Sequence, residues 1–441
     1  MQPPTGPVHA EPDKNFFIDM LTRDIDLEAA ILDLVDNSVH SLVEETGLDV
    51  SDFLLGDRRP RLRGNAGIEV TTREDRFEVR DTCGGISVSD AQNHVFLFGA
   101  PSGAMSTTGL GVYGIGLKRA VFKLGKTIDV YSRRQGEEFQ VHIDVDEWRN
   151  KTGWTFDFVK PDPRLRAKLE RDGTVIAVNR LKEGVGQRFG LNPFRKELER
   201  RMSTTYALFL KAGLKIMVNG QQLEPSLPEI AWSKGLTPSR RYFTIDDVAV
   251  LLVGGIAGRT DQGPRGGWYV FCNGRMVLEA DRTELTGWGE NFPAFHSKYN
   301  SFVGYVYFRS TNPQSLPWTT TKNSVVRDSV VYEKALQEMK VQGRPIINFL
   351  NKLYPSEVPE EGVAERALIE DAIPVPLDQI PKRDAVFAAK PRKAKSDYVN
   401  IIYKVLKKDV DRVRASIGKP EMPAYKVGLF TFKYYLEKES S

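Results

Sequence analysis

Three polar side chains share one face of a predicted helix and could bind a charged ligand. In the segment ILDLVDNSVH, residues 31–40, Asp33, Asn37 and His40 stand at positions i, i+4 and i+7, which lie on the same side of an α-helix. The other residues of the segment are mostly apolar. An acid, an amide and an imidazole in one stripe indicate a site for something polar and charged, although a solvated face of an amphipathic helix has the same pattern.

Two further segments place polar groups where a base could bind. In RDTCGGIS a predicted strand delivers Asp81 into a turn that contains Gly84 and Gly85. A carboxylate beside such flexible backbone can accept a hydrogen bond from a buried exocyclic amine, as adenine would offer. In DGTVIAV, Thr174 begins another predicted strand and could hydrogen-bond a base or a water beside Asp81. Taken alone, DTCGG is equally typical of a structural turn.

A glycine-rich segment leads directly into a predicted helix. In GLGVYGIGLKRA the first turns of that helix carry Lys118 and Arg119. Backbone N–H groups, the positive end of the helix dipole and a lysine together form a cradle for phosphates. The glycines are Gly109, Gly111, Gly114 and Gly116. The segment lacks the GxxxxGK[ST] pattern of a P-loop, and glycine patterns of this kind also arise by chance.

The four segments together are stronger evidence than any one alone, because each suits a different part of the same ligand. Asp81 and Thr174 suit a base. Asn37 suits Mg²⁺ or a phosphate, and residues 111–118 suit a triphosphate. We therefore expect a nucleotide site that is built differently from a P-loop.

The elements that must position these groups predict a two-layer α+β domain. A long helix is expected from Asp26 to Glu45, and a shorter one is expected to end at Gly125 as its C-cap. Partial alternation of apolar and polar residues predicts strands. Their sequences are GIEVTT, RFEVRDTC, KTIDVYSRR, EEFQVHIDVDEW, TGWTFDFV and GTVIAVNRL. Residues 93–116, rich in glycine, serine and threonine, are expected to form a mobile loop.

Beyond this domain we expect a second unit of strands and helices, and then a tail. NG dipeptides between apolar runs predict tight turns or hairpins at Asn219 and Asn273. The acidic, proline-interrupted segment 355–381 is typical of a linker. A basic tract follows it; such tracts are mostly solvated, and contact with nucleic acid is the alternative. Two amphipathic helices are predicted in the tail.

Composition narrows the classes of protein. A chain of 441 residues exceeds the size of one hydrophobic core, so two or three domains are expected. The two cysteines, Cys83 and Cys272, form neither a disulfide framework nor a metal-ligand spacing and suit a reducing cytoplasm. The sequence has no apolar run long enough for a membrane span and no signal-peptide pattern. A net charge of +4 permits a nucleic-acid partner without arguing for one.

The motifs ILDLVDNS, RDTCGGIS, GLGVYGIGLK and DGTVIAV, in this order, resemble those of the GHKL ATPases, the superfamily of gyrase, a heat-shock chaperone, histidine kinases and MutL. The resemblance covers about residues 15–185 and implies a Bergerat-fold α/β sandwich that binds ATP and Mg²⁺. It implies that Asp33 activates water, that Asn37 holds Mg²⁺ and that Asp81 binds the adenine amine. Thr174 would support an adenine-bound water. The remaining ATP-binding positions that it implies are Gly85, Ile86, Gly109, Leu110, Gly111, Val112, Tyr113, Gly114, Ile115, Gly116, Leu117 and Lys118.

Three positions depart from the family pattern. Asp33 replaces the more usual glutamate; a shorter base can act through a repositioned water, so slow hydrolysis is expected. Cys83 stands where a first glycine is common and has less freedom at positive φ, although Gly84 can take the turn instead. His40 stands where many MutL-like relatives have an acid, and we expect it to hydrogen-bond locally rather than to act in chemistry.

The second unit resembles, more loosely, the transducer domain that follows the ATPase domain in gyrase, MutL and MORC-type members. In LPWTTTKNSV, Lys322 lies in a polar loop between a predicted strand and a helix. The resemblance implies that this lysine reaches the γ-phosphate; a surface lysine is the alternative. The expected division of the chain is an N-terminal arm at 1–15, a GHKL ATPase domain at 16–190, a transducer-like domain at 191–354, a linker with the basic tract at 355–396 and a helical region at 397–441.

The expected function is a Mg²⁺-dependent ATPase that changes shape with its nucleotide and forms a homodimer. ATP would order residues 93–108 over the phosphates, Lys322 would lock the two units together, and the N-terminal arms would close two protomers. Its target could be DNA, bound by the basic tract Lys390–Lys395, or a protein, bound by the C-terminal region as in a chaperone or signalling ATPase. A nucleotide-binding scaffold without useful turnover is the third class. The sequence has no DxHxxxxExxxxE nuclease motif.

Overall fold

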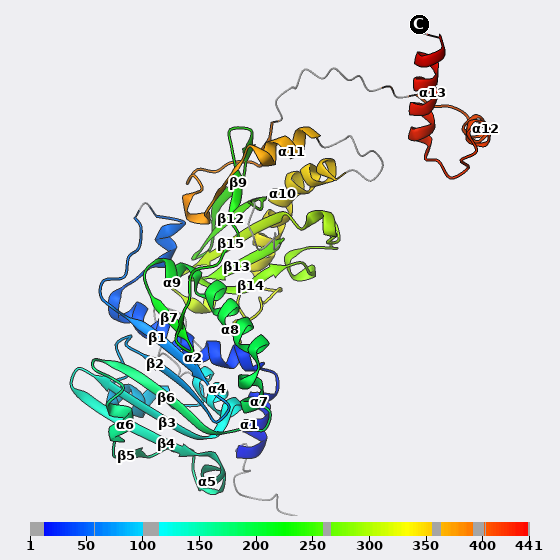
Figure 1. The fold of residues 1–441 in the computed structure, drawn as a ribbon. Coiled ribbons are helices and arrows are strands. Elements are labelled where there is room, and N and C mark those ends of the chain that lie inside the picture. The colour runs from blue at the N-terminus through cyan, green and yellow to red at the C-terminus, as the bar shows by residue number, and fades with distance from the viewer. Residues whose placement is uncertain are drawn as a thin grey trace, which may run out of the picture.

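The N-terminal part of the chain forms a broad mixed sheet with helices packed on it (Figure 1). The computed structural model describes residues 13–56, 58–99, 114–258, 266–354, 363–390, 401 and 403–439. The strand order of the sheet is β5-β4-β3-β6-β2-β1-β7-β8, and all its neighbouring strands are antiparallel except β1 and β7. The strands are β1 Gly67–Thr72, β2 Arg76–Asp81, β3 Gly125–Arg134, β4 Glu137–Asp144, β5 Phe158–Val159, β6 Gly173–Leu181, β7 Lys215–Val218 and β8 Gln221–Gln222.

The helix that carries the first motif has well-defined ends. Helix α2 (Leu27–Thr46) begins after Asp26, whose side chain accepts a hydrogen bond from the backbone N–H of Ala29, and it stops at Gly47 in the left-handed conformation. The expected helix from Asp26 to Glu45 is therefore confirmed. The other helices of this part are α1 Lys14–Arg23, α3 Val88–Asp90, α4 Gly116–Leu124, α5 Val145–Asn150, α6 Pro163–Arg166, α7 Val185–Gly190, α8 Asn192–Thr205 and α9 Ala207–Lys211.

The core of this part lies between the sheet and helices α2 and α4. Alternate residues of β1 and β2 are buried, as expected for strands with one face on a core. Side chains from both layers meet there, among them Ile31, Leu34, Val35, Ile68, Val70, Phe77, Val79, Val121 and Phe122. The opposite face of the sheet carries a separate small cluster formed by Tyr131, Leu165, Leu169, Val175 and Ala177. The expected two-layer α+β arrangement is thus present.

Two of the predicted strands are shorter than expected. The side chain of Asp144 accepts hydrogen bonds from the backbone N–H groups of Asp146 and Glu147 and so starts helix α5. The expectation that strand β4 continues to Trp148 is therefore wrong. Of the segment TGWTFDFV, strand β5 takes only Phe158–Val159.

A second sheet of five strands packs against the long helix α10 (Val330–Leu353) (Figure 1). Its order is β11-β12-β15-β13-β14, with β13 and β15 parallel and the other neighbours antiparallel. The strands are β11 Ser239–Ile245, β12 Val248–Ile256, β13 Gly267–Cys272, β14 Arg275–Asp281 and β15 Phe302–Arg309. Helix α10 approaches strand β12 closely at Gly254: a Cβ added to this glycine would lie 2.8 Å from Cδ1 of Ile346. The expected second unit of strands and helices is present.

Both NG dipeptides form hairpins, as expected. Asn219 and Gly220 connect β7 to β8, Asn273 and Gly274 connect β13 to β14, and all four residues have positive φ. The first hairpin has a further consequence, because β7 pairs with β1 and belongs to the first sheet. The first sheet therefore includes two strands, β7 and β8, that lie beyond the segment 16–190 assigned to the ATPase domain. The domain limits themselves remain predictions.

Much of the segment expected to be a linker is folded. It contains helix α11 (Val363–Glu370) and the short strands β16 (Ile373–Val375) and β17 (Ala388–Ala389), which pair with β9 (Ile230–Trp232) and β10 (Leu236–Thr237). Its buried apolar residues are Leu368, Val375, Leu377, Ile380 and Phe387. The linker expectation is therefore wrong for residues 363–390, because apolar side chains between the prolines anchor the segment to the second unit.

The tail contains the two expected helices, α12 (Lys407–Ile417) and α13 (Ala424–Glu439), which contact each other and lie apart from both sheets (Figure 1). Several large apolar side chains of α13 are exposed: Leu429, Phe430, Phe432, Tyr434, Tyr435 and Leu436. Among the described residues, no helix is both long enough and apolar enough to cross a membrane. Residues 1–12 of the expected N-terminal arm and most of the basic tract Lys390–Lys395 lie outside the described residues, whereas Lys14 and Asn15, also assigned to the arm, already belong to helix α1.

Candidate nucleotide site

Asp33 forms a buried ion pair at the start of helix α4. Its Oδ2 accepts hydrogen bonds from Nε and Nη2 of Arg119 at 3.1 and 2.6 Å. Burial raises the pKa of Asp33 above its usual value, although Lys322 and Arg119 oppose that rise. A carboxylate with a raised pKa is a stronger base, which suits the role that the sequence predicts for Asp33.

The start of α4 lies directly beside this carboxylate. A Cβ at Gly116 would stand 3.6 Å from Cγ of Asp33, and Gly114 has a positive φ of 63°. The structure therefore brings the end of the glycine-rich motif next to the predicted base. Ile115 precedes α4 and Leu117 is buried in it. The predicted positions Gly109, Leu110, Gly111, Val112 and Tyr113 lie outside the described residues.

Lys118 has a buried environment at the same helix start. Its Nζ donates a 2.8 Å hydrogen bond to the carbonyl of Val95 and also contacts the carbonyl of Gly114. Burial lowers the pKa of Lys118 to about 7. A phosphate group nearby would stabilise the protonated form, so this lysine suits an anionic ligand. Its contact with a phosphate remains a prediction.

A second buried acid, Asp36, joins the two units of the chain. Its carboxylate accepts hydrogen bonds from Nε of Arg275 at 2.8 and 2.9 Å, from Nζ of Lys322 at 3.0 Å and from the hydroxyl of Tyr206 at 2.8 Å. All four residues are buried. Burial raises the pKa of Asp36, but Arg275 and Lys322 together outweigh it and hold the pKa below its usual value. Asp36 therefore stays ionised as the counter-ion of two cations.

The loop that carries Lys322 is held at this junction by two arginines. Nη1 of Arg275 donates to the carbonyl of Lys322, and Nη2 of Arg119 lies 3.5 Å from the carbonyl of Thr320. Lys322 itself has a positive φ of 50°, a conformation that the loop must stabilise. The loop of the second unit thus contacts Arg119 of α4, the residue that pairs with Asp33 of α2. Its lysine is buried, so the alternative of a surface lysine is wrong.

The other end of the site is formed around Asp81. This buried carboxylate accepts hydrogen bonds from the hydroxyl of Ser38 at 2.7 Å and from the backbone N–H of Cys83 at 2.9 Å. Burial raises the pKa of Asp81 to about 6, although both hydrogen bonds oppose the rise. Thr174 stands opposite Asp81 across β2 and β6. The structure therefore brings together Asp81 and Thr174, the two residues that the sequence predicts to contact the adenine base.

Ser132 is a member of this group that sequence reasoning missed. Its hydroxyl lies 3.1 Å from that of Thr174 and accepts a 2.8 Å hydrogen bond from the backbone N–H of Ile86. It thus links the predicted adenine turn to β6. A serine inside a strand gave no signal of its own, because only the pairing of β3 with β6 places it beside Thr174.

The turn after Asp81 needs glycine at two positions. Gly84 and Gly85 have φ of 108° and 71°, whereas Cys83 is absent from the described residues with positive φ. The departure at Cys83 is therefore tolerated because Gly84 takes the turn. At Gly85 the backbone is also crowded, since a Cβ there would lie 2.1 Å from the carbonyl oxygen of Arg133.

Gly85→Ala is expected to destabilise the protein far more than Gly136→Ala. Both positions have positive φ, which costs about 1–2 kcal/mol in an L-residue, but Gly136 has open space around it and serves as a matched control. We expect the unfolding free energy to fall by about 1 kcal/mol for Gly136→Ala and by roughly 3 kcal/mol or more for Gly85→Ala. Urea denaturation measures both, and equal losses would show that Gly85 is not crowded.

The two remaining residues of the helical stripe lie on α2 as expected. Asn37 is half-buried, one turn after Asp33. Nε2 of His40 lies 3.3 Å from Oε1 of Glu44, one turn further on, so His40 has a local partner; that it takes no part in chemistry remains a prediction. Burial lowers the pKa of His40; Glu44 opposes this and Lys322 adds to it. Asp36 lies off the stripe and was missed; an acid within an otherwise apolar helix was its one signal.

The comparison with known families covers the first part of this site. Residues 25–171 match the family model described as Histidine kinase-, DNA gyrase B-, and HSP90-like ATPase. The chain therefore contains a GHKL-type ATPase domain, a kind of domain that generally binds ATP with Mg²⁺. Thr174 and Lys322 lie outside the matched range. No curated protein matches the chain.

The residues present fit such a ligand. The buried Asp81 can accept a hydrogen bond from an adenine amine, and Thr174 and Ser132 add hydroxyls beside it. The amide oxygen of Asn37 is a hard donor that could hold Mg²⁺ together with phosphate oxygens, and the ion would neutralise phosphate charge there. Among the described residues no group of three or more His, Cys, Asp or Glu side chains could hold a metal on its own.

Proposed function

We propose that this protein is an ATP-hydrolysing conformational switch in which the second unit senses the γ-phosphate. The observation that carries the proposal is the buried contact of Lys322 with Asp36, 3.0 Å apart, because it puts the cation of one unit on the helix that carries Asp33 in the other. A γ-phosphate bound beside Gly116 would compete with Asp36 for Lys322. Such a competition makes the contact between the units depend on the nucleotide.

The proposed cycle assigns a step to each group. Asp81 would accept the adenine amine, and the backbone at the start of α4 with Lys118 would bind the phosphates. Lys322 would move from Asp36 to the γ-phosphate. Asp33 would orient the attacking water and take its proton, and loss of the γ-phosphate would return Lys322 to Asp36. A transducer-like role for residues 191–354 and closure of two protomers belong to the same proposal.

The test of the nucleotide site is the affinity of the whole chain for a non-hydrolysable ATP analogue. Asp81→Asn is expected to weaken binding by roughly 10- to 100-fold, since a hydrogen bond to a charged group contributes about 1.5–3 kcal/mol. Because burial raises the pKa of Asp81 to about 6, wild-type affinity should also fall as the pH is lowered through this value, by up to about tenfold per pH unit.

The Asp81→Asn variant also separates this effect from titration of the ligand. The phosphates of the analogue titrate equally in both experiments, so the difference between the two pH profiles reports Asp81. Titration calorimetry at pH values from about 5 to 8 measures it. If the affinities of wild type and variant change with pH in parallel, or if the affinity of the variant is unchanged, Asp81 does not bind the adenine.

The target of the switch is proposed to be DNA or a DNA-associated complex, in support of which the sequence offers the basic tract Lys390–Lys395. The second candidate is a protein partner, as for a chaperone or signalling ATPase. It is favoured by helix α13, because a helix that exposes Phe430, Phe432 and Tyr435 in one short stretch is usually covered by another surface. Salt-dependent DNA binding, with and without the analogue, distinguishes the two.

A further inference from the structure

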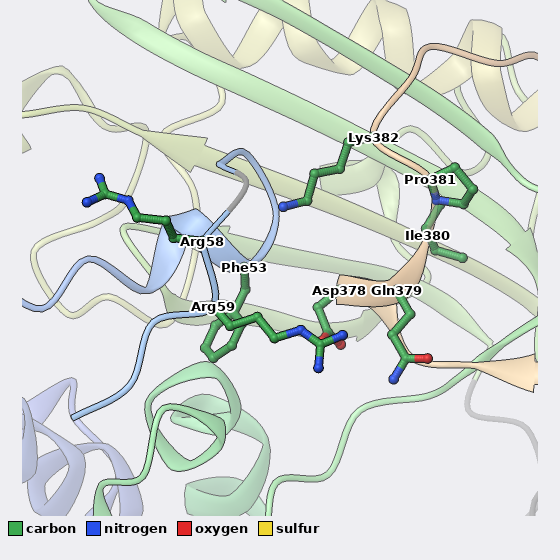
Figure 2. A pocket seen from close by; sticks show the side chains of 8 residues that line it. All are labelled: Phe53, Arg58, Arg59, Asp378, Gln379, Ile380, Pro381 and Lys382. Carbon is green, nitrogen blue, oxygen red and sulfur yellow. The ribbon is translucent and has the colours of Figure 1, made fainter. Parts of the chain in front are cut away.

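A basic groove lies at the junction of the N-terminal part with the folded segment 363–390, and the site described above uses none of its residues (Figure 2). It encloses about 380 Å³. Arg58 and Arg59 come from the loop after the short 3-10 helix Val50–Phe53, and Lys382 comes from the chain after Ile380. Two chain segments more than three hundred positions apart thus contribute cations to one concave surface.

The charge of the basic groove is not balanced from within. Its one acid, Asp378, already forms an ion pair with Lys211 outside the lining. Arg58 lies 3.5 Å from Asp52, and its side chain is 89% exposed. Arg59 and Lys382 are exposed and form no ion pair with any residue that the structure describes. The groove therefore presents cations that an external anion can reach.

The chain continues this charge on both sides of the groove. Arg61 and Arg63 follow Arg59, and Arg383 follows Lys382; all three are exposed, and within the described ranges none has an ion pair. The basic tract that begins at Lys390 comes a few residues later. A single small anion would not need so extended an array, whereas a polyanion would.

We propose that the basic groove binds the phosphate backbone of duplex DNA. The aromatic content of the lining favours a duplex over a single strand, because its one aromatic residue, Phe53, is buried at 5% exposure and has no free face on which a base could stack. Cations without aromatic platforms contact phosphates and do not read bases. This proposal rests on the proposed function, for which it locates the surface that holds the target.

The test compares two charge-reversal variants of the whole chain that change the net charge equally. Arg59→Glu/Lys382→Glu alters the groove, and Lys160→Glu/Arg164→Glu alters exposed cations around helix α6. Binding of a fluorescent 30-base-pair DNA duplex is measured by anisotropy at several salt concentrations. We expect the groove variant to lose about 10- to 100-fold in affinity at ~0.1 M salt and to flatten the log–log salt slope by roughly 2, since each phosphate contact contributes about 0.9.

Three results would overturn the proposal: equal loss in the two variants, tighter wild-type binding of a single strand than of the duplex, or the same loss for binding of an acidic peptide. Affinity for the ATP analogue is measured in parallel and should be unchanged in both variants. Loss of DNA binding with intact analogue binding supports the groove. Wild-type protein that binds DNA but not the analogue would refute the proposed switch and leave the groove standing.

Discussion

Asp33→Asn is expected to lower ATP turnover by roughly 10²- to 10⁴-fold, while the affinity for a non-hydrolysable analogue stays within a few-fold of wild type. The reason is chemical, because an amide cannot take a proton from the attacking water. Asparagine is preferred over alanine here. The side chain of Arg119 is buried against Asp33, and alanine would leave its charge without its counter-ion.

The measurement is phosphate release by the whole chain at saturating ATP, together with analogue binding by calorimetry. Asp19→Asn, which neutralises an exposed acid of helix α1, is the control and should keep full turnover. Normal turnover in Asp33→Asn would contradict the assignment of the base. Wild-type turnover no faster than this variant, with intact analogue binding, would instead identify the protein as a nucleotide-binding scaffold.

Asp36→Ala is expected to lower the free energy of unfolding by about 3–5 kcal/mol. The variant would leave Arg275 and Lys322 as buried cations without their counter-ion. Asp36 has a lowered pKa in the folded protein. Its contribution is therefore present above the unfolded value of about 3.9 and is lost as the pH falls through the lower folded value.

Urea denaturation at neutral pH measures this loss. The matched control is Asp157→Ala, which breaks an exposed pair with Lys151 whose side chains are 69% and 47% exposed. That change should cost no more than about 1 kcal/mol, because water solvates both charges. If Asp36→Ala costs as little as the control, the cluster does not hold the two units together and the proposed exchange of Lys322 loses its basis.

The sequence alone located the local elements of the site. Asp26 and Gly47 set the ends of helix α2 through capping, and the NG dipeptides at Asn219 and Asn273 set two hairpins. These features depend on interactions within a few residues, so the chain order reveals them. The motifs around Asp33 and Asp81 were recognised in another way, because their order resembles that of the GHKL ATPases, and the family comparison supports a domain of this type over residues 25–171.

Contacts between segments far apart in the chain could not be predicted from the local sequence. The partners of Asp36 lie 170, 239 and 286 positions away along the chain. The pairing of Asp33 with Arg119 spans 86 positions. Nothing in the local pattern of α2 distinguishes an acid that meets two cations from an acid that faces water, because that depends on which elements pack there.

The linker prediction for residues 363–390 was wrong because the fold of this segment, too, depends on contacts with distant segments. Residues 363–390 have the prolines and acids of a linker, yet Leu377 and Phe387 are buried against the second unit. The sequence by itself thus predicted which residues bind a nucleotide, and it located the helices and strands that carry Asp33 and Asp81. Only the tertiary structure decided the ion pairs of Asp33 and Asp36 and the place of Lys322, because the free energy of a buried charge depends on partners that folding alone brings near.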